Sequence, residues 1–389
     1  MQSLISTSDR LVQVTNCDFT RYLYDNIAWN NRLIGIVGAK GTGKTTLMLQ
    51  YLKQNFSNSN KALYASLDNL WFAQHSLLEL ADMFHSYGGT HLFLDEVHRY
   101  ADWAREIKNI YDSYPALHIV FTGSSMLEIF QASVDLSRRV ISYELKGLSF
   151  REFLKFDGKV DLPVLPLGEI LKNHRTIANN IVAQIKILPP FKHYLEYGYY
   201  PYYKEDMPTY PVRVAMSINK TFDEDLPAIE PIEYVTIAKL KKLLAVIAGM
   251  APFQPNIASL GGNVEINRNI LVKYLYLLDK AGLINCISDD KISLEKLSKP
   301  DKIYLENTNI ISALALGNQN TGNVRETFFA NQLRTKHTVN TTANGDFIID
   351  RKFVFEIGGR NKSNSQIKNI ENSYIAADDT ETGFANKIP

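Results

Sequence analysis

The chain has 389 residues, of which 45% are hydrophobic and 21% charged, and its formal net charge is +1. This length suits two or three domains, and the near-neutral charge excludes a protein-wide basic field for nucleic acid or membrane. The two cysteines, Cys17 and Cys286, make neither a metal-ligand spacing nor a disulfide framework. The N-terminal residues lack a secretory pattern, and no apolar run reaches the roughly 20 residues of a membrane helix. We therefore expect a cytoplasmic protein without membrane contact.

The first third of the chain alternates short apolar runs with helical segments. The apolar runs predict buried strands at Arg32–Gly38, Ala62–Asp68, His91–Glu96 and Leu117–Gly123. Apolar residues at helical spacing predict helices at Thr45–Phe56, Leu77–Tyr87 and Trp103–Tyr114. Strict alternation of strand and helix favours a three-layer α/β domain with a mostly parallel sheet. We assign this domain to residues 1–157.

The segment Gly38–Thr45, GAKGTGKT, fits the P-loop pattern, because it follows a predicted strand and precedes a predicted helix. Glycines let backbone N–H groups curl around an anion, and the helix N-terminus adds positive partial charge. We expect Lys44 to reach the β- and γ-phosphates of a nucleotide and Thr45 to offer its hydroxyl to Mg²⁺. The alternative is a glycine-rich turn without a ligand. The predicted nucleotide-binding residues are Gly38, Ala39, Lys40, Gly41, Thr42, Gly43, Lys44, Thr45 and Thr46.

An acidic pair at the end of the third predicted strand supplies the second element that a P-loop needs. Asp95 is expected to bind Mg²⁺ directly or through water, and Glu96 to polarise the attacking water. The alternative is a charged cap on a strand. Together with the P-loop, the pair predicts ATP and Mg²⁺ as cofactors, Thr45 and Asp95 as metal ligands, and Lys44 and Glu96 as catalytic residues.

Polar residues follow the fourth predicted strand, where a side chain can sense the γ-phosphate or the lytic water. Thr122, Ser124 and Ser125 are the candidates, with Ser124 first, and the alternative is a Gly-Ser turn that caps a helix. Arg138 and Arg139 come next, and an arginine here can act as a finger toward a phosphate. That phosphate would lie in the same chain or in a neighbouring subunit of an oligomer. The alternative for either arginine is a surface ion pair.

Five segments resemble, in this order, the prokaryotic AAA-type ATPases of the "ATP-binding protein" group: GAKGTGKTT, LYASLD, LFLDEVHRYADWAREIKNIYD, VFTGSS and ELKGLSFREFL. The resemblance implies an additional-strand (ASCE) P-loop fold, binding of ATP/ADP with Mg²⁺, and hydrolysis of ATP. The residues that it places on the family's motifs are Lys44 and Thr45 (P-loop), Asp95 and Glu96 (Walker B), and Ser124 (sensor). Arg139 falls where the family has an arginine before its LSFREF-type segment, but Arg138 stands where the family has glycine.

The chain changes character after the first domain. Residues 158–230 begin with a proline-bearing stretch and continue as a mainly helical connector or lid. Residues 231–298 show the pattern of a winged helix-turn-helix, whose second helix is expected to begin near Asn267. Contact with DNA through Tyr234–Ile284 and contact with an unidentified protein are both open. In the DNA interpretation, Arg268 and Lys273 lie on exposed faces of the second helix.

The tyrosine-rich segment Tyr194–Asp206 belongs to the connector. Aromatic residues at this density are expected to pack in a core or an interface, and an aromatic platform for nucleic-acid bases is the alternative.

Residues 299–389 resemble a restriction-endonuclease-type core, a small α/β domain. In such a core an Asp and a Glu on adjacent strands bind Mg²⁺, and a lysine two residues after the Glu activates water. Asp346 and Glu356 match the two acids and Glu326 matches a helix carboxylate, but the lysine position is Gly358. Without that cation a water or phosphate loses its electrostatic partner. We therefore expect a degenerate core that serves as a scaffold.

Three functions follow from these patterns. The first is an ATP-driven switch, in which the nucleotide state is coupled to the winged-helix and C-terminal regions. The second is a low-turnover, nucleotide-gated module that binds DNA or protein. The third is a metal-dependent nuclease that uses Asp346 and Glu356, for which Arg360 or Lys362 would have to supply the missing cation.

Overall fold

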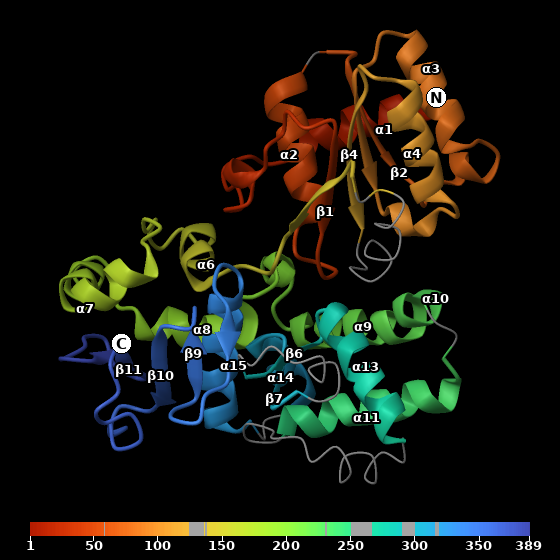
Figure 1. Ribbon diagram of the computed structural model, residues 1–389. Helices are drawn as coiled ribbons and strands as arrows, with labels where there is room; N and C mark the ends of the chain where they lie inside the picture. The colour runs from red at the N-terminus through yellow and green to blue at the C-terminus, as the bar shows by residue number, and fades with distance from the viewer. Residues whose placement is uncertain are drawn as a thin grey trace. The chain divides into compact units, whose positions relative to one another are not determined.

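The computed structural model describes residues 1–57, 59–123, 136, 138–229, 232–249, 267–289, 300–315 and 319–389, and the chain divides into two compact units. The units are Met1–Gly147 and Leu148–Pro389, and Figure 1 labels the elements of each. The first unit ends before the expected boundary after residue 157 because helix α6 (Phe150–Phe156) packs within the second unit. The rings of Phe150 and Phe153 each lie 5.4 Å from the ring of Tyr194.

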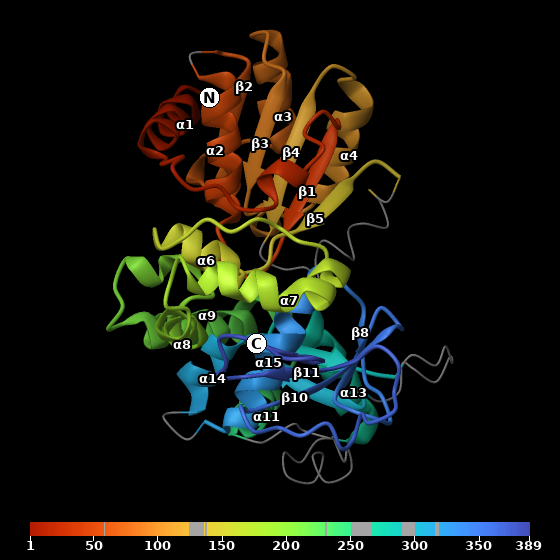
Figure 2. The ribbon, with the colours of Figure 1, turned by 90° about the vertical axis from the view of Figure 1, so that its left-hand side faces the viewer.

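A parallel five-stranded sheet forms the centre of the first unit. Its strands are β1 (Leu33–Val37), β2 (Ala62–Ser66), β3 (His91–Asp95), β4 (His118–Gly123) and β5 (Ile141–Glu144). Their order is β2-β3-β4-β1-β5, so β4 lies between the strand before the P-loop and the strand that ends in Asp95 (Figure 2). The first four strands confirm the predicted ones. Strand β5 escaped prediction because most of its residues are exposed, and it therefore lacks an apolar run.

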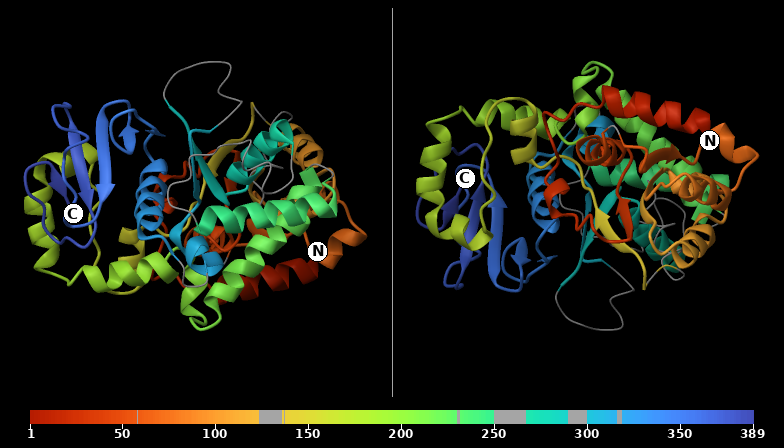
Figure 3. Two further views of the ribbon diagram at one scale, coloured as in Figure 1. Left: turned by 90° about the horizontal axis from the view of Figure 1, so that it is seen from below. Right: turned by 90° about the horizontal axis from the view of Figure 1, so that it is seen from above.

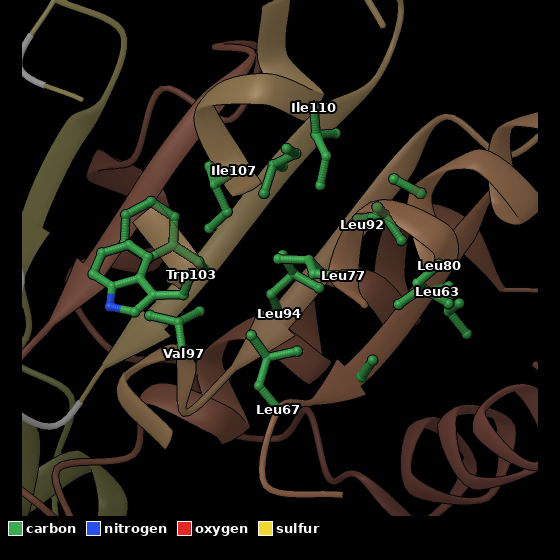
Figure 4. Close-up of a cluster of buried hydrophobic side chains, with 14 of the residues drawn as sticks. Leu63, Leu67, Leu77, Leu80, Leu92, Leu94, Val97, Trp103, Ile107 and Ile110 are labelled. Carbon is green, nitrogen blue, oxygen red and sulfur yellow. The ribbon is translucent and has the colours of Figure 1, made fainter. Parts of the chain in front are cut away.

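Helices cover both faces of this sheet. They are α1 (Gln2–Val14), α2 (Lys44–Phe56), α3 (Leu77–Ser86) and α4 (Trp103–Ser113), with short 3₁₀ turns at Tyr24–Asn26, Leu70–Ala73 and Val97–Arg99. Successive strand residues point to opposite faces, and the mostly buried residues of β1 to β4 show that these four strands are covered on both sides. One face packs against α2, and the other packs against α3 and α4. Figure 4 shows this second contact, with the side chains Leu77, Leu80, Ile107 and Ile110 directed toward Leu63, Leu92 and Leu94. The result is the predicted three-layer arrangement.

Helices make up most of the described part of the second unit as far as Arg334. These are α6, α7 (Leu167–Val182), α8 (Leu188–Tyr197), α9 (Tyr210–Lys220), α10 (Leu226–Ile229), α11 (Tyr234–Gly249), α13 (Arg268–Lys280), α14 (Thr308–Ala315) and α15 (Thr321–Arg334), with a 3₁₀ turn at Pro201–Lys204 and a π-helical turn at Thr221–Asp225. The tyrosine-rich segment packs among them, because Tyr194, Tyr199 and Tyr203 are buried. This burial confirms the packing interpretation of these tyrosines.

Part of the expected winged-helix module is described. Helices α11 and α13 are followed by an antiparallel pair of strands, β6 (Ile284–Ile287) and β7 (Lys302–Leu305). Residues 250–266 and 290–299, which include the expected turn between the helices, lie outside the described residues, as does the side chain of Arg268. The winged-helix assignment therefore stays a prediction.

A second five-stranded sheet ends the chain. Its strands are β8 (Val339–Asn340), β9 (Phe347–Ile349), β10 (Phe353–Gly358), β11 (Ser373–Ala377) and β12 (Lys387–Ile388). They lie in the order β12-β11-β10-β9-β8. Neighbouring strands from β8 to β10 are antiparallel, and those from β10 to β12 are parallel. The strands run side by side in both views of Figure 3 (blue). Phe347, Phe355 and Ile357 form the core of this sheet with Ala330 of α15. None of the described helices combines the length and the apolar character needed to cross a membrane.

Candidate nucleotide site

The loop between β1 and α2 depends on glycine for its shape. Gly41 and Gly43 have φ angles of 80° and 94°, in the left-handed region that side chains rarely adopt. Gly38 has φ 151°, and a Cβ atom there would lie 2.3 Å from the backbone oxygen of Leu145. Helix α2 begins directly after the loop at Lys44, so the backbone N–H groups of its first turn are directed toward the loop. This is the backbone arrangement that holds an anion.

The side chain of Lys44 turns back onto the loop that precedes it. Its Nζ atom donates to the backbone oxygens of Gly38 at 2.8 Å and Ala39 at 3.0 Å, and the residue is only 5% exposed. The Thr42 hydroxyl also donates to Ala39 O, at 3.0 Å. A buried ammonium requires such acceptors. The positive charge of Lys44 is thus held inside the cradle that a phosphate would enter. Of the other residues expected to bind nucleotide, Lys40 is half-buried and Thr46 is exposed.

Asp95 is the centre of the polar network beside this loop. It is 3% exposed, and its Oδ2 atom accepts hydrogen bonds from Thr45 Oγ1 at 2.7 Å and from the Tyr64 hydroxyl at 2.8 Å. Its Oδ1 atom accepts from the Thr122 hydroxyl and from the Glu96 backbone N–H, the latter at 3.1 Å. Thr45 and Asp95 therefore present a hydroxyl and a carboxylate to one point, the hard oxygen ligands that Mg²⁺ prefers. These donor atoms fit a nucleotide-bound magnesium ion.

The hydroxyl of Tyr64 donates a hydrogen bond to Asp95 at every physiological pH. Burial, reinforced by the neighbouring Asp95 carboxylate, raises the pKa of Tyr64 far above its usual range. The phenol therefore keeps its proton at physiological pH and donates to the carboxylate throughout. Sequence reasoning missed this residue, because an aromatic side chain in a predicted strand gives no sign of a polar role.

Glu96 follows Asp95 in an unusual backbone conformation. Its φ and ψ angles are 52° and 42°, in the left-handed region, where glutamate is rare. The pKa of Glu96 is raised, mainly by burial and further by the adjacent Asp95 carboxylate. The positive charges of Lys44, Lys40 and Arg99 oppose this rise. A half-buried carboxylate with a raised pKa is a suitable proton acceptor near neutral pH. His98 Nε2 lies 3.3 Å from Glu96 Oε2.

The polar position that the structure places at the end of β4 is Thr122. Its buried hydroxyl contacts Asp95 and also accepts from the Glu96 backbone N–H at 3.3 Å. Ser124 and Ser125, which the sequence ranks with it, lie outside the described residues. The sensor role of Ser124 stays a prediction.

Arg139 lies far from the loop within its own chain. Its Nε atom donates to Asp112 Oδ1 and its Nη2 atom to Asp112 Oδ2, each at 3.0 Å, and its guanidinium lies over the ring of Tyr111. It precedes β5, whose first residue pairs with Ile34 at the start of β1, whereas the P-loop follows the end of β1. The length of a five-residue strand, about 16 Å, separates those two edges. A finger role for Arg139 stays a prediction that requires a second copy of the chain.

Arg21 is a further residue that sequence reasoning missed. It is 4% exposed, and its Nη1 atom donates to Thr42 O at 2.6 Å. Its Nη2 atom donates to Lys146 O and Gly147 O, each at 2.8 Å. One guanidinium thus joins the P-loop to the last two residues of the first unit. A lone arginine upstream of the P-loop belongs to no motif, so the sequence carries no signal for this contact.

Residues 30–154 match the model of a protein family described as an AAA domain. The chain contains an AAA-type P-loop domain, and most of it lies in the first unit. This match confirms the domain type that the sequence predicts, and the AAA domain includes the P-loop, Asp95, Glu96 and Thr122. Residues 189–321 match a second family, which is described as a domain of unknown function.

Proteins similar to this chain include the following three. An uncharacterized protein of Methanocaldococcus jannaschii is 27% identical over 286 residues, 70% of this chain. The chain spans 60% of the length of this curated relative. Among solved structures, the Walker-type ATPase of Pyrococcus abyssi has a TM-score of 0.43 and 15% identity, covering 79% of this chain and 95% of that chain. AMPPCP-bound DnaA from Aquifex aeolicus has a TM-score of 0.31 and 15% identity, covering 67% and 80%.

A second group of expected site residues lies beyond the AAA domain, on the C-terminal sheet. Glu356 on β10 is 1% exposed, and Lys362 Nζ lies 2.5 Å from its Oε1 atom. The hydrogen bond to Glu356 raises the pKa of Lys362. A Cβ atom at Gly358 would lie 2.6–2.7 Å from the Cβ, Cγ and Cδ atoms of Lys362. The aliphatic part of Lys362 therefore crosses the space that a side chain at position 358 would fill, and it brings a cation to Glu356.

The other two acids share a second lysine. Lys302 Nζ lies 3.4 Å from Asp346 Oδ1 and 3.6 Å from Glu326 Oε2. Asp346 Oδ2 also accepts from the Ile357 backbone N–H at 2.8 Å, and Glu326 accepts from the Tyr304 hydroxyl at 2.6 Å. Burial, with the nearby Asp346 charge, raises the pKa of Glu326. Within the ranges that the structure describes, no group of three or more His, Cys, Asp or Glu residues is arranged to hold a metal ion.

Proposed function

We propose that the chain is an ATP-hydrolysing AAA-type switch protein, whose nucleotide state is coupled to the second unit as an effector region. The observation that carries the proposal is the 2.7 Å contact between Thr45 Oγ1 and Asp95 Oδ2. It joins the P-loop to the acidic pair, and the charge of Lys44 also acts on Glu96. The family match of residues 30–154 supports ATP as the nucleotide.

Each of these residues has a distinct task in the proposed reaction. The loop N–H groups and Lys44 bind and orient the phosphates. Thr45 and Asp95 hold Mg²⁺, which neutralises charge on the phosphate oxygens when bound. Glu96 accepts the proton of the attacking water, and its raised pKa makes it a stronger base than an exposed glutamate. Thr122 and Tyr64 keep the Asp95 carboxylate in one orientation.

Arg21 supports the coupling part of the proposal. Because its guanidinium binds Thr42 O and also Lys146 O and Gly147 O, a movement of the P-loop displaces the residues that end the first unit. Hydrogen exchange of the Lys146 and Gly147 amides is expected to change on addition of ATP. Lysine cannot span both sets of carbonyls, so Arg21→Lys is expected to reduce that change while ATP still binds. An equal change in both proteins contradicts the coupling route.

ATP turnover by wild type, Lys44→Ala and Glu96→Gln tests the catalytic part. Lys44→Ala is expected to lose ATP binding, because the phosphates lose their main cation. Glu96→Gln is expected to bind ATP normally and to turn over about 100-fold more slowly. Equal turnover by Glu96→Gln and wild type contradicts the assignment of the base.

The same assay with and without duplex DNA separates the switch from a low-turnover binding module. ATP binding with negligible wild-type turnover, together with DNA affinity that falls steeply with salt, favours the binding module. Loss of that affinity in Lys273→Ala would locate the contact on α13. ATP turnover by a protein that has no affinity for DNA would favour another protein as the partner of this chain.

A second candidate function is a metal-dependent nuclease in residues 299–389. The observation that favours it is the 2.5 Å contact of Lys362 Nζ with Glu356, since the sequence pattern lacks a cation at Gly358. Asp346 and Glu356 would hold the divalent ion, which polarises a phosphodiester when bound. Lys362 would orient the attacking water.

Nicking of supercoiled plasmid in the presence of Mg²⁺ or Mn²⁺ tests the nuclease. Activity is expected to disappear in Lys362→Met and to persist in Lys352→Met, which removes an exposed lysine in the turn before β10. If the wild-type protein does not nick the plasmid, the nuclease function is excluded and the scaffold interpretation remains.

A further inference from the structure

We propose that His98 is a positioning residue for Glu96, and that it holds the carboxylate in the orientation from which it accepts a proton from water. This inference rests on the proposed ATPase function. His98 lies in the 3₁₀ turn Val97–Arg99 directly after the acidic pair. Its side chain is 4% exposed, whereas the Glu96 side chain is 29% exposed, and its Nε2 atom lies 3.3 Å from Glu96 Oε2.

The backbone of Glu96 is fixed independently of its side chain. Its N–H donates to Asp95 Oδ1 and Thr122 Oγ1, and these contacts hold the left-handed conformation. They leave the three side-chain torsions of the glutamate unrestrained, and a freely rotating carboxylate spends little time in any one orientation. The imidazole of His98 is rigid and buried, so its contact restrains those torsions.

The chemistry of imidazole suits this task. In its neutral form with the proton on Nε2, the ring donates one hydrogen bond without adding a full positive charge. A lysine or arginine in this place would stabilise the carboxylate anion strongly and make Glu96 a weaker base. The histidine contact takes up Oε2 and leaves Oε1 as the acceptor for the water proton. Orientation is thereby gained with little loss of basicity.

ATP turnover in a double-mutant cycle tests the proposal. His98→Ala is expected to lower kcat about 10- to 100-fold, the size of effect that misplacing a catalytic group produces. The KM for ATP should change by less than about twofold, because binding of the phosphates is assigned to the P-loop and not to His98. His98→Gln places an amide N–H at similar reach and is expected to recover most of the rate. In a Glu96→Gln background, His98→Ala should have no further effect.

The controls separate this role from general stability. His118→Gln changes a histidine at the amino end of β4, away from Glu96, and should leave kcat unchanged. If His98→Ala unfolds, the comparison of His98→Gln with His98→Asn, whose shorter amide cannot reach Glu96, replaces it. Equal losses from His98→Ala in the wild-type and Glu96→Gln backgrounds overturn the proposal. Absence of wild-type turnover overturns the ATPase function instead.

A measurement without nucleotide tests the contact itself. In ¹H–¹⁵N NMR of the nucleotide-free protein, the His98 Nε2–H signal is expected to be protected from exchange with water. It should shift and exchange faster in Glu96→Ala, and it should stay unchanged in the control Glu106→Ala. A His98 signal that is the same in wild type and Glu96→Ala contradicts the proposal.

Discussion

The Thr45 hydroxyl donates a 2.7 Å hydrogen bond to Asp95 Oδ2, although the two residues are 50 positions apart in the chain. The contact is possible because β1 and β3, parallel strands of one sheet, both end at the same edge. Loops at the carboxyl ends of parallel strands are where α/β proteins build their binding sites. Two segments that are unrelated in sequence thus share one site.

Removal of the Thr45 hydroxyl should weaken binding of nucleotide only when magnesium is present. Thr45→Ala is expected to lower the affinity for Mg²⁺-ATP about tenfold, equivalent to about 1.4 kcal/mol, because one oxygen ligand of the ion is lost. Thr45→Ser keeps the hydroxyl and should bind as wild type. Titration calorimetry with ATP, with and without Mg²⁺, measures the effect. An equal loss under both conditions would show that the hydroxyl does not act through the metal.

Removal of the Tyr64 hydroxyl should destabilise the AAA domain. Tyr64→Phe deprives the buried Asp95 carboxylate of one donor, and a buried charged acceptor without its partner costs about 1–3 kcal/mol. The midpoint of thermal unfolding is therefore expected to fall. Tyr87→Phe, at a tyrosine that is 77% exposed, is the matched control and should have no effect. A Tyr64→Phe protein as stable as wild type would mean that water replaces the phenol.

A side chain at Gly38 should disrupt the P-loop. The Cβ atom of Gly38→Ala would lie 2.3 Å from Leu145 O, a backbone atom that cannot rotate away. ATP binding is expected to be lost, with unfolding at a lower temperature. Gly168→Ala, where nothing lies within 4 Å of the added atom, should be neutral or slightly stabilising because α7 gains a better helix former. Normal ATP binding by Gly38→Ala would contradict the tight packing of the loop.

Mild acid should destabilise the first unit through His91. Burial, followed by the nearby His118, lowers the pKa of His91 from its usual 6.5 to about 4. The folded protein therefore keeps this imidazole neutral, whereas the unfolded chain takes up a proton below pH 6.5. The stability contribution is complete above pH 6.5 and is lost progressively from pH 6.5 to 4.

The expected loss between pH 7.5 and pH 5 is about 1 kcal/mol, after a discount for partial exposure of the ring. The midpoint of unfolding, measured at the two pH values, should fall less in His91→Gln than in wild type. His85→Gln, at an exposed histidine on α3, serves as the control. The same pH dependence in wild type and His91→Gln would assign the effect to other groups.

Local patterns predicted most of the AAA domain. The P-loop and the acidic pair are contiguous segments whose chemistry can be read directly, and the apolar runs of β1 to β4 are continuous because these strands are buried on both faces. The position of β4 between β1 and β3 could not be read from local patterns, because no spacing along the chain encodes the order of strands in a sheet. Strand β5 was not predicted, since its exposed side chains follow no apolar pattern.

The contacts of the supporting residues could not be predicted from sequence, although Thr122 itself was a candidate as a sensor. Tyr64 and Thr122 contact Asp95 from neighbouring strands, so their roles depend on which side chains the pleat brings to one face. Arg21 is 21 residues from Thr42 and 126 from Gly147, which no local pattern connects. Such residues become visible only when the fold brings distant segments together.

The path of Lys362 over Gly358 has a consequence for how related chains vary. The space beside Glu356 admits one long side chain, either from the strand at position 358 or from the following loop at position 362. A relative with a lysine at 358 should carry a small residue at 362, and the two positions should change together. Pattern searches that demand a lysine at a fixed offset from the acid would then overlook members in which the cation reaches the same place from the loop.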